Sequence, residues 1–296
     1  MSNINAHLIS ILFTIFICST GAYAKWENLR VKYALWDGFY KIPLTVGDAA
    51  PEYVKMSHDE FLNVDLYSYP NDPRVSVLFD THGNIAGLRT AYIKEDLDKR
   101  AESKGMKPYF SLYSYDDKPM YTSGNYWNTP LWYTSVLFMS PEKLKAGGRP
   151  DPKGLVAEDI YLKLDGNWTL IPKDECKAES LGFTKQGCFI GMGKHYFYKV
   201  TPTSDCNDYQ GAFLLYEKGE LIGLGINPFG SFTSKDRVWF EDVPAKVVKS
   251  IVADGPECLE NHVEMFGVTS LHIFFKNSPR LTFCTWPWQK SGQCEK

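Results

Sequence analysis

Three histidines in the C-terminal half are the residues whose chemistry the sequence indicates most directly. They are His195, His262 and His272, and Glu264 follows the second of them closely. In a strand, alternate side chains share one face, so His272 can point into the same interior as His195. An imidazole titrates near neutral pH and is the commonest general acid or base. We therefore take His195 and His272 as candidate catalytic residues.

The same side chains could hold a metal ion. Three imidazole nitrogens and one carboxylate suffice for a mononuclear site, so the candidate ligands are His195, His262, Glu264 and His272. The chain contains no His-x-His, Glu-x-x-His or His-Glu-x-x-His spacing, which would place two ligands on one element. A histidine packed in a core or exposed to solvent is the more frequent case. We therefore expect neither a metal nor any other cofactor.

Aromatic residues give the second chemical signal. They make up 15% of the chain and gather at residues 109–115 and 126–133. Aromatic side chains bury large areas and stack on planar or sugar-like ligands, which suits a binding pocket. We predict ligand-binding roles for Trp127, Trp132, Tyr133 and Tyr196. Packing in a β-rich core is the alternative interpretation.

Nucleophilic catalysis has less support. The sequence lacks a Gly-x-Ser-x-Gly elbow, which disfavours the common serine hydrolases. Ser140 lies three residues before Lys143, but the proline between them favours the start of a helix. Paired carboxylates for glycoside hydrolysis converge only in space, so the sequence leaves that chemistry open.

The first residues indicate export. Residues 8–19 are almost entirely apolar, and Ala22-Tyr23-Ala24 is the small-x-small pattern that signal peptidase cuts. We therefore expect residues 1–24 to be a signal peptide and residues 25–296 to form the secreted, extracellular protein. Of the seven cysteines, Cys18 lies in this leader and the rest follow residue 175.

Six cysteines behind a leader predict up to three disulfides, with fifteen pairings to choose from. The cysteines concerned are Cys176, Cys188, Cys206, Cys258, Cys284 and Cys294. We favour Cys176 with Cys188, and Cys206 with one of Cys258, Cys284 or Cys294. Asn167 opens the one glycosylation sequon and follows an Asp-Gly turn, so we predict an exposed, glycosylated asparagine.

Composition excludes two classes of partner. The 32 basic and 35 acidic residues nearly balance, and binding to nucleic acid needs a basic surface. After the leader, no stretch approaches the roughly 20 apolar residues of a membrane span. We therefore expect no nucleic acid and no membrane span once the leader is removed.

The dominant sequence period is two, with recurring turn signals. It predicts hairpins at 75–92, 159–171 and 212–225, and strands at 195–201 and 268–275. Short helices are predicted at 57–66, 94–103, 140–146 and 244–254. The expected fold is mainly β, an antiparallel barrel or sandwich with a few short helices and a disulfide-stapled C-terminal half. We expect a single β-rich domain, with a sub-domain seam at residues 147–154 as the alternative.

Several segments together carry a resemblance. They are residues 191–198 (Gly-Met-Gly-Lys-His-Tyr-Phe-Tyr), 213–216, 219–223 and 270–275. This pattern resembles one in secreted invertebrate β-rich proteins of poorly established function. The resemblance implies a shared β-rich fold and no particular reaction. It draws attention to His195 and His272, which lie inside the matching segments.

These observations predict a secreted protein that binds a small apolar or aromatic ligand in an aromatic-lined pocket. The alternative is a secreted enzyme that uses the same pocket. Its reaction would be that of an oxygenase or luciferase-like oxidoreductase, or of a hydrolase with a histidine as acid–base. A surface interaction protein is a third hypothesis, and it would need an exposed apolar patch.

Overall fold

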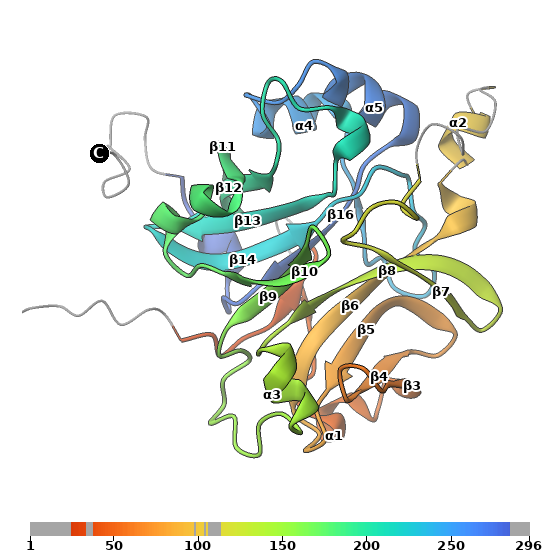
Figure 1. Cartoon of the computed structure of the whole chain (residues 1–296), viewed down its shortest axis with the longest axis vertical. Coiled ribbons are helices and arrows are strands. Elements are labelled where there is room, and N and C mark those ends of the chain that lie inside the picture. The colour runs from red at the N-terminus through yellow and green to blue at the C-terminus, as the bar shows by residue number, and fades with distance from the viewer. Residues whose placement is uncertain (1–24, 34–37, 98, 104, 106–113, 285–296) are drawn as a thin grey trace, which may run out of the picture.

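Two antiparallel β-sheets and a pair of helices form three layers in the computed structural model, which describes residues 25–33, 38–97, 99–103, 105 and 114–284 (Figure 1). The sheets pack against each other, and the helices cover the outer face of one of them. Each sheet is built largely from strands that follow one another in the chain, because hairpins connect most neighbours.

The first sheet, here called the N-terminal sheet, has the strand order β10-β9-β8-β6-β5-β4-β3, and β7 also pairs with β8. Its strands are β3 (Val54–Asp59), β4 (Val64–Tyr69), β5 (Asp72–Phe79), β6 (Ile85–Ile93), β7 (Thr122–Tyr126), β8 (Thr129–Leu137), β9 (Ile160–Leu164) and β10 (Asn167–Ile171).

The second sheet, the C-terminal sheet, has the order β11-β12-β13-β14-β16-β1-β2, and β15 also pairs with β16. Its strands are β1 (Arg30–Val31), β2 (Tyr40–Lys41), β11 (Phe183–Phe189), β12 (Gly193–Tyr198), β13 (Ala212–Glu217), β14 (Glu220–Ile226), β15 (Glu241–Asp242) and β16 (Thr269–Phe274). Within the described residues neither sheet closes on itself. Of the two expected architectures, the sandwich is therefore the one observed.

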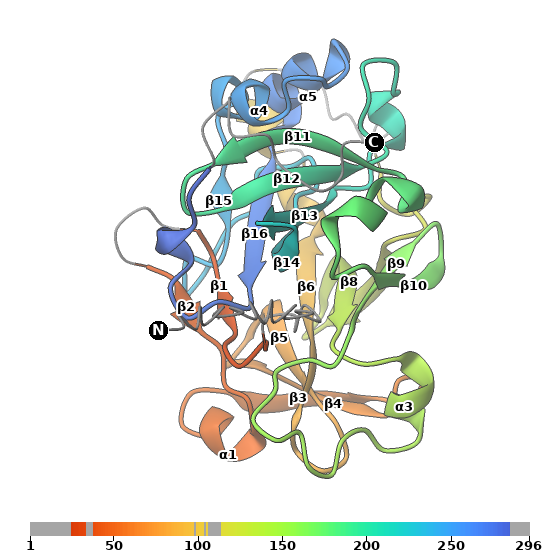
Figure 2. The same ribbon diagram turned by 90° about the vertical axis from the view of Figure 1, so that its left-hand side faces the viewer.

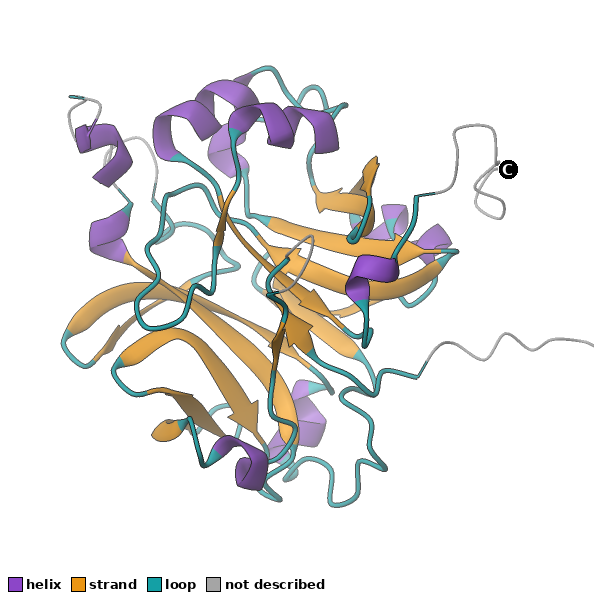
Figure 3. Ribbon diagram, turned by 180° about the vertical axis from the view of Figure 1, so that it is seen from behind, coloured by secondary structure: helices purple, strands orange, loops and turns teal. Residues whose placement is uncertain are grey.

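The helices are short and lie outside the two sheets (Figure 3). They are α1 (Val46–Ala49), α2 (Lys99–Ser103), α3 (Pro141–Lys145), α4 (Ala245–Ile251), α5 (Cys258–Phe266) and the 3₁₀ turns η1 (Lys94–Asp96), η2 (Glu175–Lys177), η3 (Glu179–Leu181), η4 (Cys206–Asp208) and η5 (Pro279–Leu281). Helices α4 and α5 lie above β11 and β12 (Figure 2). None of the helices in the described ranges is long and apolar enough to cross a membrane.

The main core lies between the sheets. Val75 and Val77 of β5 and Leu224 of β14 are all fully buried in one apolar cluster. The segment before β1 covers one side of this core, where the ring of Trp26 packs with its centroid 4.9 Å from that of Phe275. A second, smaller apolar cluster lies on the outer face of the N-terminal sheet. It consists of Leu62, Val64, Leu66, Leu78, Ala86, Leu137, Met139 and Leu144.

Most predicted elements are confirmed. The three hairpins correspond to β5–β6, β9–β10 and β13–β14, and the two single strands to β12 and β16. Asp165 and Gly166 adopt the positive φ angles, 47° and 83°, that a tight hairpin turn requires. The helix predicted after Ser140 is α3, whose first turn is capped because the hydroxyl of Ser140 accepts from the N–H of Lys143.

Two helix predictions are wrong or incomplete. Residues 57–66 form parts of β3 and β4 with the turn between them. The carboxylate of Asp59 there bonds the guanidinium of Arg89 and the N–H of Leu62, so long-range pairing outweighs the local capping pattern. Residues 94–103 divide into η1 and α2. Helix α5 was not predicted, although Leu259, Val263 and Phe266 follow helical spacing.

The described disulfides are Cys188–Cys284 and Cys206–Cys258. The predicted Cys176–Cys188 bond is therefore wrong. Cys188 lies near the end of β11, and the segment of Cys284 lies beside that end. The N–H of Gly191, just past β11, donates to the carbonyl of Thr282 at 2.8 Å. Cys176 is itself disulfide-bonded, and Cys294 lies outside the described residues.

Residues 147–154, the proposed seam, form the loop between α3 and β9. Strands β8 and β9 on either side of this region belong to the same sheet. The chain passes from the C-terminal to the N-terminal sheet at residues 42–53 and returns at residues 172–182. The predicted signal peptide, residues 1–24, lies outside the described part of the chain.

Candidate functional site

A cavity of about 60 Å³ lies between the outer face of the C-terminal sheet and helices α4 and α5. Most of its walls are apolar side chains, among them Phe197, Phe213, Val248, Ile251, Leu259 and Val263. Four polar side chains also face it, namely His195, Asn227, Ser270 and His272. An apolar cavity with a few convergent polar groups is the usual form of a small-molecule site.

The pairing of four strands brings the sheet side of this cavity together. Phe197, Phe213, Gly225 and His272 lie directly across from one another on β12, β13, β14 and β16. A Cβ atom at Gly225 would lie only 2.0 Å from the ring of Phe213. The absence of a side chain at this glycine therefore makes room for the ring of Phe213. The centroid of that ring lies 4.9 Å from the centroid of the His272 imidazole.

The imidazole of His272 is held from one side. Its Nδ1 lies 2.8 Å from Oε2 of Glu241, and the other carboxylate oxygen of Glu241 accepts from the backbone N–H of Tyr33. In a neutral imidazole Nδ1 therefore carries the proton, because an ionised carboxylate only accepts, and Nε2 then presents a lone pair. That Nε2 atom is buried and has no hydrogen-bond partner among the described residues.

Asn227 adds a second acceptor. Its Oδ1 atom is also buried without a partner in the described structure, and its side chain lines the same cavity. A buried acceptor without a hydrogen bond costs about 1–3 kcal/mol. A molecule with an O–H or N–H group inside the cavity would satisfy either atom.

His195 has a different character. Burial, together with the neighbouring His272, lowers its pKa to about 3, although hydrogen bonds with the carbonyls of Gly187 and Gly193 oppose the shift. The ring therefore stays neutral near physiological pH and forms part of the cavity wall, 6.2 Å from the ring of His272. The structure thus brings the two predicted catalytic residues to one cavity, but only His272 offers an unpartnered nitrogen.

The four predicted metal ligands do not converge. His262 lies on α5, with its Nδ1 3.0 Å from the carbonyl oxygen of Cys258, and Glu264 is exposed on another side of that helix. The one described group with metal-ligand spacing is Cys206, Cys258 and His262. Its two cysteines are joined as a disulfide, so they offer no thiolate to a metal.

The four predicted ligand-binding aromatics lie elsewhere. Trp127 is 43% exposed at the β7–β8 turn, and buried Trp132 donates from Nε1 to Asp116 at 2.9 Å. Tyr133 lies over the guanidinium of Arg89, and buried Tyr196 donates to Glu175. The described cavity beside His272 uses other rings. Two of these rings, Phe197 and Phe213, lie on β12 and β13, which the sequence did predict as strands. The alternation of side chains along those strands could therefore have identified them.

Glu241 is the functional residue that sequence reasoning missed. Adjacent carboxylates in a strand point to opposite faces, so the sequence by itself favours a solvated edge for Glu241 and Asp242. In the structure, β15 pairs with β16, and Glu241 lies across from Ser270. The sequence gives no signal of this pairing. Only this long-range pairing places its carboxylate beside His272.

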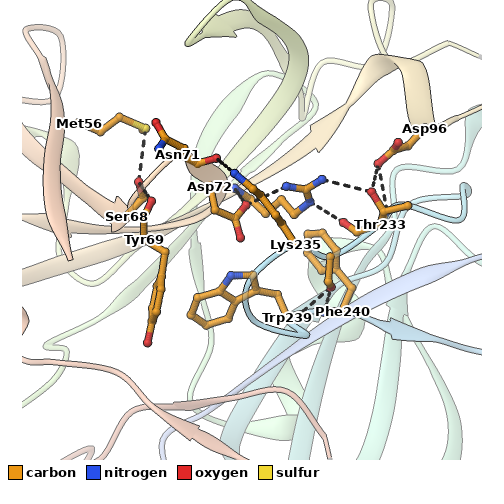
Figure 4. Close-up of polar contacts among 12 residues, drawn as sticks. Met56, Ser68, Tyr69, Asn71, Asp72, Asp96, Thr233, Lys235, Trp239 and Phe240 are labelled. Atoms are coloured by element: carbon orange, nitrogen blue, oxygen red, sulfur yellow. Dashed lines mark hydrogen bonds and ion pairs between the residues drawn. The ribbon is translucent and has the colours of Figure 1, made fainter. Parts of the chain in front are cut away.

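The loop that leads to Glu241 is anchored on the N-terminal sheet (Figure 4). The guanidinium of Arg74 donates to the carbonyl and hydroxyl oxygens of Thr233, and also bonds buried Asp72. Asp96 accepts from the N–H and hydroxyl of Thr233. Burial raises the pKa of Asp96, but the hydrogen bonds that its carboxylate accepts from Lys99 and Thr233 lower the pKa by more. The pKa of Asp96 is therefore below its ordinary value. An ionised carboxylate therefore holds the loop.

Comparisons with family models, curated proteins and solved structures found no match for this chain. The resemblance to secreted invertebrate proteins stays a prediction. The geometry around His272 is therefore the basis for a functional proposal.

Proposed function

We propose that the protein binds a small, largely apolar molecule that carries a hydroxyl or N–H group, in the cavity between the C-terminal sheet and α4–α5. The observation that carries the proposal is the unpartnered Nε2 of His272 in an apolar surrounding. The walls would supply affinity at about 25 cal/mol per Å² of apolar surface buried. The hydrogen bond to Nε2 would orient the ligand.

The size of the cavity limits the ligand. About 60 Å³ is well below the roughly 150 Å³ that holds benzene and the ~300 Å³ of larger ligand sites. An aromatic ligand therefore needs one helix to shift. Helix α5 is tied to η4 through the Cys206–Cys258 bond at its first residue. Since no described disulfide involves α4, we expect α4 to move outward.

We also propose that the protein acts outside the cell. The two described disulfides support an oxidising compartment. Asn167 is exposed at the β9–β10 turn, where a glycan would meet no obstacle.

Phenol and toluene form a matched pair of probes, since they share a ring and differ in one hydrogen-bond donor. We expect phenol to bind several-fold more tightly, because one hydrogen bond contributes about 1 kcal/mol net. His272→Phe should remove that preference, and the exposed control His82→Phe should retain it. Titration followed by amide chemical shifts measures both affinities. Equal binding of the probes by the unaltered protein would contradict the proposal.

A second candidate function is catalysis by His272 as general base. The favouring observation is the carboxylate of Glu241 on Nδ1, because this arrangement orients an imidazole to accept a proton at Nε2. An ester hydrolase or an oxygenase-type enzyme would both use such a base. Turnover of 4-nitrophenyl acetate or consumption of oxygen that disappears in His272→Ala, with phenol binding retained, would establish catalysis. Binding without turnover would exclude these two reactions.

A further inference from the structure

A second cavity, of about 310 Å³, lies on the outer face of the N-terminal sheet. The inner faces of the two sheets pack together, so this cavity and the His272 cavity are on opposite sides of the sandwich. We call it the β8 slot and define it by Asp59, Phe61, Arg89, Tyr133, Lys163 and Trp168. Its volume is in the range of sites for small molecules.

The slot exists because β8 changes partners along one edge. Strand β7 pairs with β8 as far as Tyr133, and β9 begins to pair with it at Val136. Thr134 and Ser135 lie between these pairs, and on this edge they face no described strand. Both line the slot. Ser135 points its side chain to the outer face, where its hydroxyl accepts from Arg89, whereas Thr134 alternates with it and points inward beside Trp132 and Val136.

The floor of the slot is rigid and nearly neutral. Arg89 donates to Asp59 at 2.6 Å and to the hydroxyl of Ser135 at 3.0 Å, and its guanidinium lies 4.3 Å from the ring centre of Tyr133. Burial raises the pKa of Asp59, but its bonds with Arg89 and with backbone N–H groups outweigh burial and lower the pKa overall. The carboxylate is therefore ionised and balances the charge of Arg89.

The rim of the slot carries the aromatic rings of Phe61 and Trp168 and the positive charge of Lys163. Lys163 and Trp168 are directly paired across β9 and β10 and so lie side by side on the outer face. No described carboxylate forms an ion pair with the ammonium group of Lys163. Phe61 is 65% exposed in the turn after β3, and that turn is held because Asp59 accepts from the N–H of Leu62 at 3.0 Å.

We propose that the β8 slot binds a sugar unit that carries a carboxylate, as a uronic acid does. The C–H faces of a sugar ring pack on aromatic rings such as those of Tyr133 and Trp168. Its hydroxyls find donors and acceptors in the hydroxyl of Ser135 and in the backbone groups of the unpaired β8 edge. The carboxylate pairs with Lys163, whose charge nothing else in the slot cancels.

The experiment titrates the full chain with D-glucuronic acid and with D-glucose and follows amide chemical shifts. We expect glucuronate to bind about tenfold more tightly, since a charge-assisted hydrogen bond contributes about 1.5–3 kcal/mol. Lys163→Met should abolish this preference, and Trp168→Leu should weaken both sugars. Lys246→Met, a matched change at an exposed lysine on α4, should leave both affinities unchanged.

His272→Phe separates this proposal from the function proposed above, because it alters the other cavity and should leave glucuronate binding intact. Three results would overturn the proposal. They are equal affinity for the two sugars, no saturable binding of glucuronate at tens of millimolar, and a preference that survives in Lys163→Met.

Discussion

The carboxylate of Glu241 lies 2.8 Å from Nδ1 of His272, across a separation of 31 residues. The two-residue strand β15 adds to β16 and places the carboxylate there. The same carboxylate also accepts from the N–H of Tyr33, which precedes β2. One side chain thus joins three parts of the C-terminal sheet and determines which nitrogen of His272 faces the cavity.

Removing this carboxylate should destabilise the fold. In Glu241→Ala, the N–H groups of Tyr33 and of His272 Nδ1 lose their acceptor, at a cost of about 2–4 kcal/mol. Denaturant unfolding measures the loss. Asp242→Ala is the matched control, because that neighbouring carboxylate is exposed, and its unfolding free energy should change by less than about 0.5 kcal/mol. Equal losses in the two variants would contradict the assigned role of Glu241.

His195 should make stability depend on pH. Its pKa is about 3 in the folded protein and about 6.5 in the unfolded chain. Between these values the unfolded chain binds a proton that the folded protein does not, so the unfolding free energy falls as the pH falls. The slope approaches about 1.4 kcal/mol per pH unit.

Unfolding measured between about pH 5 and 6, above the range where most carboxylates titrate, tests this dependence. His195→Phe should lower the pH dependence of the unfolding free energy by most of the amount that one proton contributes, about 1.4 kcal/mol per pH unit. His82→Phe, at an exposed histidine, should leave the slope unchanged. A slope that is the same with and without the His195 imidazole would show that this ring titrates normally in the folded state.

The sequence predicted the strands because their signals are local. The Asp165–Gly166 turn and the alternating apolar residues of β13 and β14 specify hairpins by themselves. The same alternation placed His195 and His272 on one face. The alternation does not predict the order of the strands in space. That order places Glu241 beside β16 and leaves the gap between β7 and β9.

The errors have the same physical origin. Ser57 to Glu60 has the spacing of a helix cap, but Asp59 bonds Arg89 of a neighbouring strand, and that tertiary contact prevails. The short loop between Cys176 and Cys188 favours that pairing only on local grounds. The bond that forms, Cys188–Cys284, closes a separation of 96 residues because the fold brings the two segments together.

Gly225 should tolerate no side chain. In Gly225→Ala the new methyl group would lie 2.0 Å from the ring of Phe213, so that ring must leave its place beside His272. Overpacking of this kind costs about 1–3 kcal/mol. Gly47→Ala is the control, because α1 is open there and alanine favours a helix by up to about 1 kcal/mol. Unchanged stability and ring contacts in Gly225→Ala would contradict the described packing.

The Cys206–Cys258 bond should stabilise the helical cover of the cavity. It closes a separation of 52 residues, for which the loss of chain entropy corresponds to about 4 kcal/mol. The double alanine variant should unfold more easily, and amide hydrogen exchange of α5 should accelerate. Removing Cys188–Cys284 should also destabilise the protein but should leave exchange in α5 slower than in the first variant. The reverse order would show that α5 is held by packing alone.

Nitrogen-15 NMR of the His272 ring tests the central claim most directly, because it reports which nitrogen carries the proton and whether the other accepts a hydrogen bond. We predict a proton on Nδ1, a free lone pair on Nε2, and a shift of the Nε2 resonance when phenol but not toluene is added. A proton on Nε2, or an Nε2 resonance that phenol leaves unmoved, would contradict the proposed binding site.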